Sequence, residues 1–330
     1  MHIFTNPNYN FLRWKWHAVG LSWVIIFAGL VVIYTKGMPR GIEFAGGTSV
    51  IAQFAQTPSV EAVRAALNAN YAGGGRDAIV QTYGDPSQRQ VMVRVPQVGA
   101  EAGGALSATA KAVEDALRKG NLGDFTVVGT EIVGPAVGKE LTQKGIYAFL
   151  ASLAGILAYI AFRFQFSFAV GAVVATVHDI LVTFAFLAFF QYDISLNVIA
   201  AILTVTGYST NDTIVIFDRV RENLRSKRRE DLSTVINTSI NQTLGRTVIT
   251  AGTVLLSAIS LFAFGGEVLR GFAFTMIVGV ITGTYSSVFV AAAIVTFWRR
   301  QATRAVSEAV PSAAATPSRR AKAQRKARAS

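Results

Sequence analysis

The sequence predicts an α-helical polytopic membrane protein with six transmembrane helices and an inserted α+β ferredoxin-like domain. Hydrophobic residues make up 52% of the 330 residues and charged residues only 15%, which is too apolar for an ordinary soluble protein. Several segments of about 20 apolar residues are each long enough to cross a bilayer as a helix. One polar stretch, 36–143, interrupts these segments and is long enough to fold as a domain with its own core.

Six apolar segments are the expected spans, and basic residues decide their orientation. The segments are 18–35, 145–162, 168–190, 194–217, 247–264 and 271–298. Arginine and lysine gather before the first span, at Arg163, between spans four and five, and after the last span, whereas the opposite turns carry only Arg270. Because basic loops stay in the cytoplasm, both termini are expected there. No cleavage site precedes the first span, so we expect it to be retained rather than removed as a signal peptide.

This orientation divides the chain into five regions. They are a cytoplasmic N-terminus (1–17), a first helix (18–35), a periplasmic domain (36–143), five helices with a basic cytoplasmic loop at 218–245 (144–298), and a basic disordered tail (299–330). The tail ends in SRRAKAQRKARAS, which favours attraction to anionic lipid. It lacks interleaved aromatic residues, so no nucleic acid is expected to bind it.

The polar stretch shows the element order of a ferredoxin-like sandwich. Strands are predicted at TSVIAQF, on both sides of a turn at 84–87, and at DFTVVGTEIVG. Helices are predicted at TPSVEAVRAALNA, with Thr57 as the cap and Pro58 at the first helical position, and at ALSATAKAVEDALRKG. The order strand–helix–strand–strand–helix–strand is typical of that fold. No pair of catalytic carboxylates, phosphate-binding loop or metal cluster occurs, so no enzyme, cofactor or metal is expected.

Asp212 stands out because it is an acid within the apolar fourth span. A carboxylate at the centre of a bilayer costs about 2.5–3.5 kcal/mol on insertion scales. Arg246 lies near the inner end of span five, and spans four and five run antiparallel, so the two residues are expected at similar depths where they can pair. Tyr208 and Ser209 precede Asp212 by four and three positions and line the same helix face. Asn211 widens this polar patch.

Two explanations stay open for these intramembrane residues. Burial disfavours a charged carboxylate and a nearby arginine favours it, so a change of conformation can move a proton on and off Asp212. Alternatively, Asp212 only caps a packed helix end and Arg246 extends to the inner interface. Asp179, in the third span, fits a proton relay and a structural hydrogen bond to span four equally well. Its neighbour His178 is expected to be structural, and the small residues of span six, such as Gly279 and Gly283, predict tight helix packing.

Five motifs occur in order along the chain and carry a resemblance to a known family. They are GIEFAGGT, EIVGPAVGKEL, GYSTNDTIVIFDRVREN, INQTLGRTVITAGT and GTYSS. Between Phe4 and Trp298 the chain closely resembles the SecF family, the smaller half of the bacterial SecDF protein-export factor and a member of the resistance-nodulation-division superfamily. The first motif supplies Gly41, Gly46 and Gly47. It departs from the family at Glu43, where the family usually has aspartate.

The resemblance implies a function and a set of partners. SecF works with SecD and uses the proton-motive force to drive or complete protein translocation across the bacterial inner membrane. The family's intramembrane acid and arginine correspond to Asp212 and Arg246, with protons as the coupling ion and no cofactor. The implied partners are SecD, the SecYEG channel and the translocating polypeptide, with YajC and YidC as further candidates. A proton-coupled lipid or drug transporter and a non-energised scaffold of the translocon are the alternatives.

Overall fold

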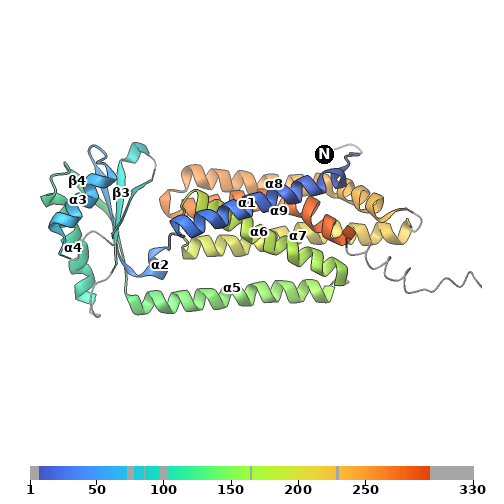
Figure 1. Ribbon diagram of the computed structural model, residues 1–330, viewed down its shortest axis with the longest axis horizontal. Coiled ribbons are helices and arrows are strands. Elements are labelled where there is room, and N and C mark those ends of the chain that lie inside the picture. The colour runs from blue at the N-terminus through green and yellow to red at the C-terminus, as the bar shows by residue number, and fades with distance from the viewer. Residues whose placement is uncertain are drawn as a thin grey trace, which may run out of the picture.

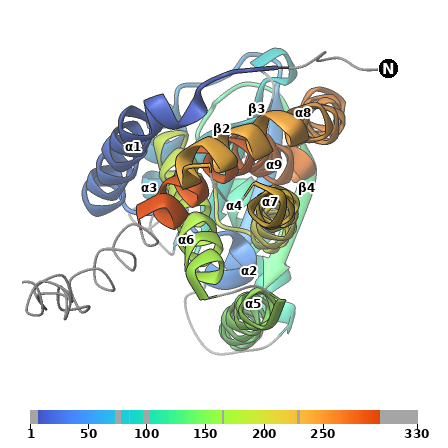
Figure 2. The same ribbon diagram turned by 90° about the vertical axis from the view of Figure 1, so that its right-hand side faces the viewer.

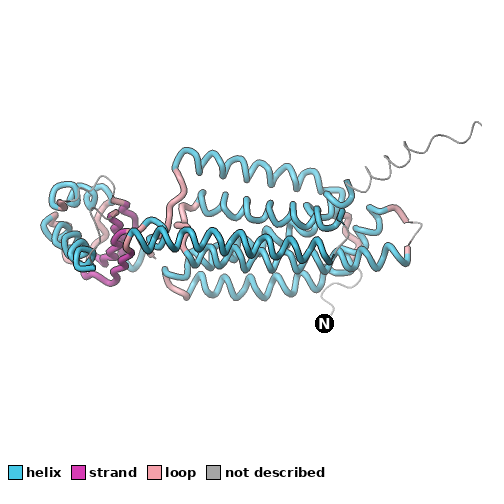
Figure 3. The backbone as a smooth tube through the Cα atoms, turned by 90° about the horizontal axis from the view of Figure 1, so that it is seen from below, coloured by secondary structure: helices cyan, strands magenta, loops and turns pink. Residues whose placement is uncertain are grey.

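A bundle of long helices and a small α/β domain at one end of it make up the molecule (Figure 1). The computed structural model describes residues 7–72, 78–84, 86–96, 103–163, 166–227 and 230–297. The predicted basic tail, 299–330, and part of the predicted turn at 84–87 lie outside the described residues. The long axes of the bundle helices run in the same general direction as the long axis of the molecule (Figure 3).

Long apolar helices account for the bundle. Their bounds are α1 (Lys15–Lys36), α5 (Pro135–Arg163), α6 (Phe166–Phe189), α7 (Leu196–Ser226), α8 (Leu232–Phe264) and α9 (Glu267–Ser286), and α9 continues into the π-helical turn η3 (Ser287–Ala291). Within the described residues, five helical stretches are long and apolar enough to cross a membrane: 11–36, 136–163, 166–189, 232–264 and 268–297. The prediction of a polytopic membrane protein is therefore confirmed. Helix α7 is long enough to cross a membrane but is not apolar enough to count among these five.

Helix α7 packs against α5, α6, α8 and α9. Glycines bring α9 close to it. A Cβ built on Gly283 would lie 2.7 Å from the Cβ of Ser209, and one built on Gly279 would lie 2.4 Å from Cγ1 of Val205. The predicted tight packing of span six is confirmed. Helix α5, in contrast, stands apart from the main group of helices when the bundle is viewed end-on (Figure 2).

Most of the predicted connection at 218–245 is helical. Helix α7 continues to Ser226 and α8 begins at Leu232, so the connection is short. Asp231 caps α8 by accepting a hydrogen bond from the backbone N–H of Ser233. In the extended part, Asn223 Nδ2 donates to Ser239 Oγ at 2.8 Å, which joins the two helices outside their apolar segments.

The first turns of α8 also bind the backbone that precedes α1. The side-chain amides of Asn237 and Asn241 accept hydrogen bonds from the backbone N–H groups of Phe11 and Tyr9, each at 2.9 Å. The same two amides donate back to the Tyr9 carbonyl oxygen. The short 3-10 helix η1 (Phe11–Trp14) follows directly and leads into α1.

The α/β domain has the predicted element order. Its elements are α2 (Ile42–Ala45), β1 (Gly47–Phe54), α3 (Val60–Asn70), β2 (Ile79–Tyr83), η2 (Pro86–Gln88), β3 (Gln90–Val95), α4 (Gly103–Lys119) and β4 (Phe125–Val133). The sheet has the order β2-β3-β1-β4 and all of its pairs are antiparallel. Helices α3 and α4 lie on the face of the sheet away from the bundle (Figure 1). Side chains such as Val50, Val93 and Leu117 form the core between them.

One predicted helix start in this region is wrong. Helix α3 begins at Val60, and Ser59 rather than Thr57 caps it, because the Ser59 hydroxyl accepts the hydrogen bond from the backbone N–H of Ala62. Helix α5 begins at Pro135, ahead of the predicted end of the domain at 143. The polar residues at the start of α5 therefore form its first turns.

Candidate intramembrane site

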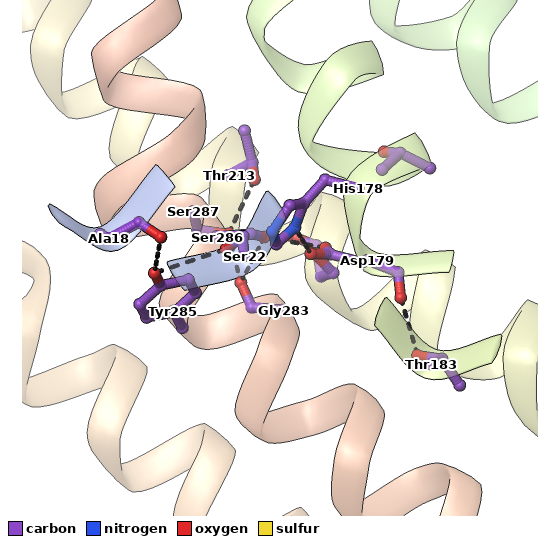
Figure 4. Close-up of polar contacts among 12 residues, drawn as sticks. Ala18, Ser22, His178, Asp179, Thr183, Thr213, Gly283, Tyr285, Ser286 and Ser287 are labelled. Atoms are coloured by element: carbon purple, nitrogen blue, oxygen red, sulfur yellow. Dashed lines mark hydrogen bonds and ion pairs between the residues drawn. The ribbon is translucent and has the colours of Figure 1, made fainter. Parts of the chain in front are cut away.

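A carboxylate with three polar partners lies inside the bundle. Asp179, on α6, is only 2% exposed. Its Oδ2 accepts hydrogen bonds from Ser209 Oγ at 2.5 Å and from Ser286 Oγ at 2.8 Å, and its Oδ1 lies 2.9 Å from Nδ1 of His178 (Figure 4). Ser209 belongs to α7 and Ser286 to α9. The carboxylate therefore ties three helices together.

Tyr285 extends this polar cluster to α1. Its hydroxyl donates to the carbonyl oxygen of Ala18 at 2.5 Å, and the ring stacks on His178 with 6.4 Å between the ring centroids (Figure 4). On the other side, the hydroxyls of Thr213 and Ser287 lie 2.8 Å apart. The cluster thus connects α1, α6, α7 and the end of α9.

The end of α9 is irregular where it meets this cluster. The π-helical turn η3 begins at Ser287, directly after Ser286. Both serines are fully buried, and Ser286 faces Asp179 while Ser287 faces Thr213. Short π-helical turns within α-helices are often found at functional sites. Here the turn lies where two adjacent hydroxyls engage two different neighbouring helices.

Asp212 is buried nearby without such partners. It is 3% exposed and lies three residues after Ser209 on α7. Within the described residues it makes no hydrogen bond, and its Oδ2 is buried with no partner. Among the described residues, the hydroxyls of Thr247 and Thr284 are also buried and unpartnered. A charged carboxylate in such surroundings is costly, so its charge state depends on what approaches it.

The predicted ion pair between Asp212 and Arg246 is not formed in this structure. No nitrogen of Arg246 lies within 4.0 Å of the Asp212 oxygens, although Arg246 still contributes a favourable electrostatic interaction. The reason is the rotation of α8. Thr247 is the buried residue of this turn, and Arg246, its neighbour, is exposed. Successive residues of a helix point about 100° apart, so the arginine is directed away from the α8 face that carries Thr247.

The other residues predicted to surround Asp212 lie in different environments. Ser209, which was expected on the Asp212 face, donates instead to Asp179. This contact confirms that Asp179 makes a hydrogen bond to span four. Tyr208 is half-buried, and Asn211 is exposed beside a groove between α5 and α7. Sequence reasoning gave no role to Tyr285, Ser286 and Ser287, although GTYSS is a polar run within an apolar span.

The motif after α1 joins the α/β domain to the bundle. The backbone N–H of Gly41 donates to the carbonyl oxygen of Ile194 at 2.6 Å, and a Cβ at this position would lie 2.4 Å from Oε2 of Glu43. Gly46 and Gly47 have φ values of 70° and 115°, which side chains disfavour, and they turn the chain from α2 into β1. The three glycines therefore allow a close approach and a sharp turn at this junction.

Comparison with known proteins defines the class. The family model described as "Protein export membrane protein SecD/SecF, C-terminal" matches residues 112–301, and the SecD/SecF GG motif model matches residues 31–58. The chain belongs to the SecD/SecF family of protein-export membrane proteins, and protein translocation is the function that this membership supports.

Its relatives narrow the comparison to one subunit. Protein translocase subunit SecF of Desulfurispirillum indicum is 42% identical over 292 residues, which cover 88% of this chain and 91% of the relative. The SecF subunit of Escherichia coli O157:H7 is 38% identical, over 87% of this chain and 86% of its own.

Solved structures agree with this comparison. The crystal structure of SecDF from Thermus is 34% identical, with a TM-score of 0.78 over 89% of this chain and 39% of the SecDF chain. SecDF in a super-membrane-facing form is 31% identical, with a TM-score of 0.66 over 93% of this chain and 41% of that one. The chain therefore spans about two fifths of the length of the SecDF proteins it matches.

Proposed function

We propose that the chain works with SecD as a proton-driven subunit that uses the proton-motive force to drive or complete translocation across the bacterial inner membrane. In this proposal it is not an enzyme, it needs no cofactor, and protons are the coupling ion. Asp212 is the proton-binding residue. The supporting observation is that Asp212 is 3% exposed and makes no hydrogen bond among the described residues.

The physical reason is the cost of an isolated charge. An ionised carboxylate without partners is strongly disfavoured in a low-dielectric interior, whereas the protonated form is neutral. Arg246 acts on Asp212 from a distance, so a small movement of α8 toward α7 would favour the ionised form. Proton binding and release are thereby coupled to helix position, which is what an energy-converting subunit requires.

The proposal includes a membrane topology. All six long helices span the membrane, including α7, which has 31 residues and lies among more apolar neighbours. Both termini are cytoplasmic because basic residues such as Arg163 and Arg225 gather at that end. The α/β domain is ferredoxin-like and periplasmic, as its element order and its antiparallel sheet favour.

The partners follow from the family. A SecD subunit would supply the rest of the SecDF assembly, of which this chain resembles about two fifths. The SecYEG channel and the translocating polypeptide complete the working complex, with YajC and YidC as further candidates. The basic tail would bind anionic lipid on the cytoplasmic side.

A pair of variants in reconstituted vesicles tests the proposal. We expect Asp212→Asn to be present at normal abundance but to lose the stimulation of export by a proton gradient, because the amide cannot titrate. The double change Asp212→Asn with Arg246→Gln keeps the site neutral and should behave in the same way. Thr204→Ala, at an exposed position about two turns earlier on the same helix, is the matched control and should retain stimulation.

Recovery of gradient-dependent export in the double variant would contradict the proposal. If the chain is only a scaffold of the translocon, changing Asp212 or Arg246 should leave the rate of export unchanged. A self-sufficient lipid or drug transporter would be purified in mild detergent without a SecD-like partner.

A further inference from the structure

A cleft separates the sheet of the α/β domain from the outer end of the bundle. Its volume is about 420 Å³, within the range of ordinary ligand sites. Strands β2, β3 and β4 line one side, with residues that include Gln81, Arg94 and Glu131. The turn between α6 and α7 and the start of α9 line the other side, with Tyr192 and Arg270 among them.

The sheet face toward this cleft is largely polar. Arg94 and Glu131 are both cross-strand neighbours of Ser49, so the three side chains lie on one face. The opposite face carries Val50 and Val93, which are covered by α3 and α4. Because one face supplies the core, the other is left open toward the bundle.

The cleft also reaches the free edge of β2. This strand is at the end of the sheet, and among the described residues it pairs only with β3. Gln81, Thr82 and Tyr83 follow one another in β2, and all three line the cleft. Successive strand residues point to opposite faces, so a cleft beneath one face would be lined by alternate residues only. The cleft therefore runs along the edge, where backbone N–H and C=O groups of β2 have no strand partner.

The charges in the cleft leave an excess of carboxylate. Arg94 is engaged, because it forms an ion pair with Asp193 at 2.7 Å and donates to the carbonyl oxygen of Arg40 at 2.7 Å. Arg270 lies over the ring of Phe262, 5.1 Å from its centroid. Neither Glu43 nor Glu131 has an ion pair or a side-chain hydrogen bond within the described part of the chain. The lining therefore holds three carboxylates against two arginines, a net charge of −1, and among the described residues the carboxylates of Glu43 and Glu131 are the ones that a ligand meets outside an ion pair.

We propose that this cleft binds an extended, lysine- or arginine-bearing stretch of the translocating polypeptide, added as a strand to the free edge of β2. The inference rests on the proposed function, which supplies an unfolded chain on this side of the membrane. Hydrogen bonds to an added strand go through the backbone, so they suit a protein that must accept many sequences. Five residues of β2 span about 17 Å, enough to hold a short segment.

The carboxylates give the cleft a preference for lysine- and arginine-bearing segments, which backbone pairing along the strand edge cannot provide. Exported lysines and arginines are drawn back by a membrane potential that is negative inside. Glu43 and Glu131 attract such cations after they have crossed. Binding here would oppose backward movement most strongly for the segments that are most prone to it.

Cysteine cross-linking in the assembled export complex tests the inference, because the native chain contains no cysteine. The Thr82→Cys variant is paired with an export precursor that is arrested in transit and carries one cysteine beside a run of lysines. Val128→Cys is the matched control, since Val128 is 48% exposed on β4, at the opposite edge of the sheet. We expect a disulfide adduct with the precursor from Thr82→Cys and none, or several-fold less, from Val128→Cys.

A second pair of measurements tests the carboxylates. Glu43→Gln with Glu131→Gln should reduce the Thr82→Cys adduct several-fold for the lysine-bearing precursor. The same precursor with glutamine in place of lysine should give an adduct that these changes do not alter. Equal losses for both precursors would overturn the role of charge.

The remaining outcomes separate this inference from the proposed function. If export still responds to the gradient while Thr82→Cys gives no precursor adduct, the cleft is not a binding site and the proposed function stands. An adduct only with a second copy of the chain, or equal adducts from both positions, also overturns the inference. If the parent chain shows no gradient response at all, the proposed function itself fails.

Discussion

Asp179 and Asp212 lie in the same bundle, both almost fully buried, yet their surroundings are opposite. Asp179 is 2% exposed and has Ser209, Ser286 and His178 as partners. Asp212 is 3% exposed and has no hydrogen bond within the described residues. Burial is nearly equal, so the difference between them lies in polar contacts alone.

Under the proposed function, this difference separates a structural acid, Asp179, from a switching acid, Asp212. The partners of Asp179 come from three helices, so its carboxylate contributes to holding those helices in register. Asp212 contributes no such contacts, and its charge state is free to follow the approach of Arg246, water or another subunit. Ser209 makes the point sharply, because it lies one helical turn from Asp212 and nevertheless donates to Asp179. We therefore expect stability to depend on Asp179 and gradient coupling to depend on Asp212.

The largest expected effect on stability is at Asp179. Asp179→Ala leaves three buried polar groups without their partner, and we expect the free energy of unfolding to fall by about 3–5 kcal/mol. Denaturant or thermal unfolding of the purified protein in detergent measures this change. Val177→Ala is the control on the same helix, because Val177 is 42% exposed and its loss should cost about 0.5 kcal/mol or less. Equal effects of the two substitutions would remove the structural role of Asp179.

An intermediate effect is expected where α9 approaches α7. The added methyl group of Gly283→Ala would lie 2.7 Å from the Cβ of Ser209, so the helices must separate and the Ser209–Asp179 contact must lengthen. Overpacking of this kind typically costs about 1–3 kcal/mol. Gly252→Ala on α8 provides the comparison, since nothing lies within 4 Å of a Cβ built there. An unfolding midpoint unchanged by Gly283→Ala would show that the packing of α9 is loose.

The smallest effect is expected at Asp212. Asp212→Asn removes no hydrogen bond of the described structure, so the free energy of unfolding should change by less than about 0.5 kcal/mol or should rise. The parallel substitution Asp179→Asn should cost about 1–3 kcal/mol, because the amide cannot accept all three contacts. A larger loss at Asp212 than at Asp179 would invert the comparison and identify Asp212 as the structural acid.

Much of the fold follows from periodicity and turn residues. Apolar runs of membrane-spanning length predicted the helices. The alternation in TSVIAQF predicted one strand and the turn at 84–87 predicted a strand on each side of it, because these signals are local. Local signals failed at helix ends. Residues 218–226 read as a loop from their charge, yet they continue α7, since helix propensity persists where apolar character stops.

The side-chain contacts of Asp212 and Asp179 could not be predicted from the sequence. The depth of Asp212 and Arg246 could be counted along their spans, but the rotation of α8 could not, and that rotation keeps the two residues apart. Ser209 binds Asp179 rather than Asp212 where α9 packs closely against α7. Gly283, from a distant part of the chain, allows this close packing. Packing between remote helices, rather than the composition of any one of them, decides these partners.

The polarity of α7 has a consequence for how the protein is made. Ribosomal synthesis delivers α7 before α8 and α9, and α7 carries Ser209, Asp212 and Thr213, which are costly to expose to lipid. The hydroxyl that faces Thr213 belongs to Ser287, and that residue emerges more than 70 positions later. In the proposed six-span topology, a nascent α7 therefore lacks the neighbour that makes it compatible with the bilayer. We therefore expect α7 to integrate stably only after the rest of the chain has been made, in a late, concerted step rather than one helix at a time.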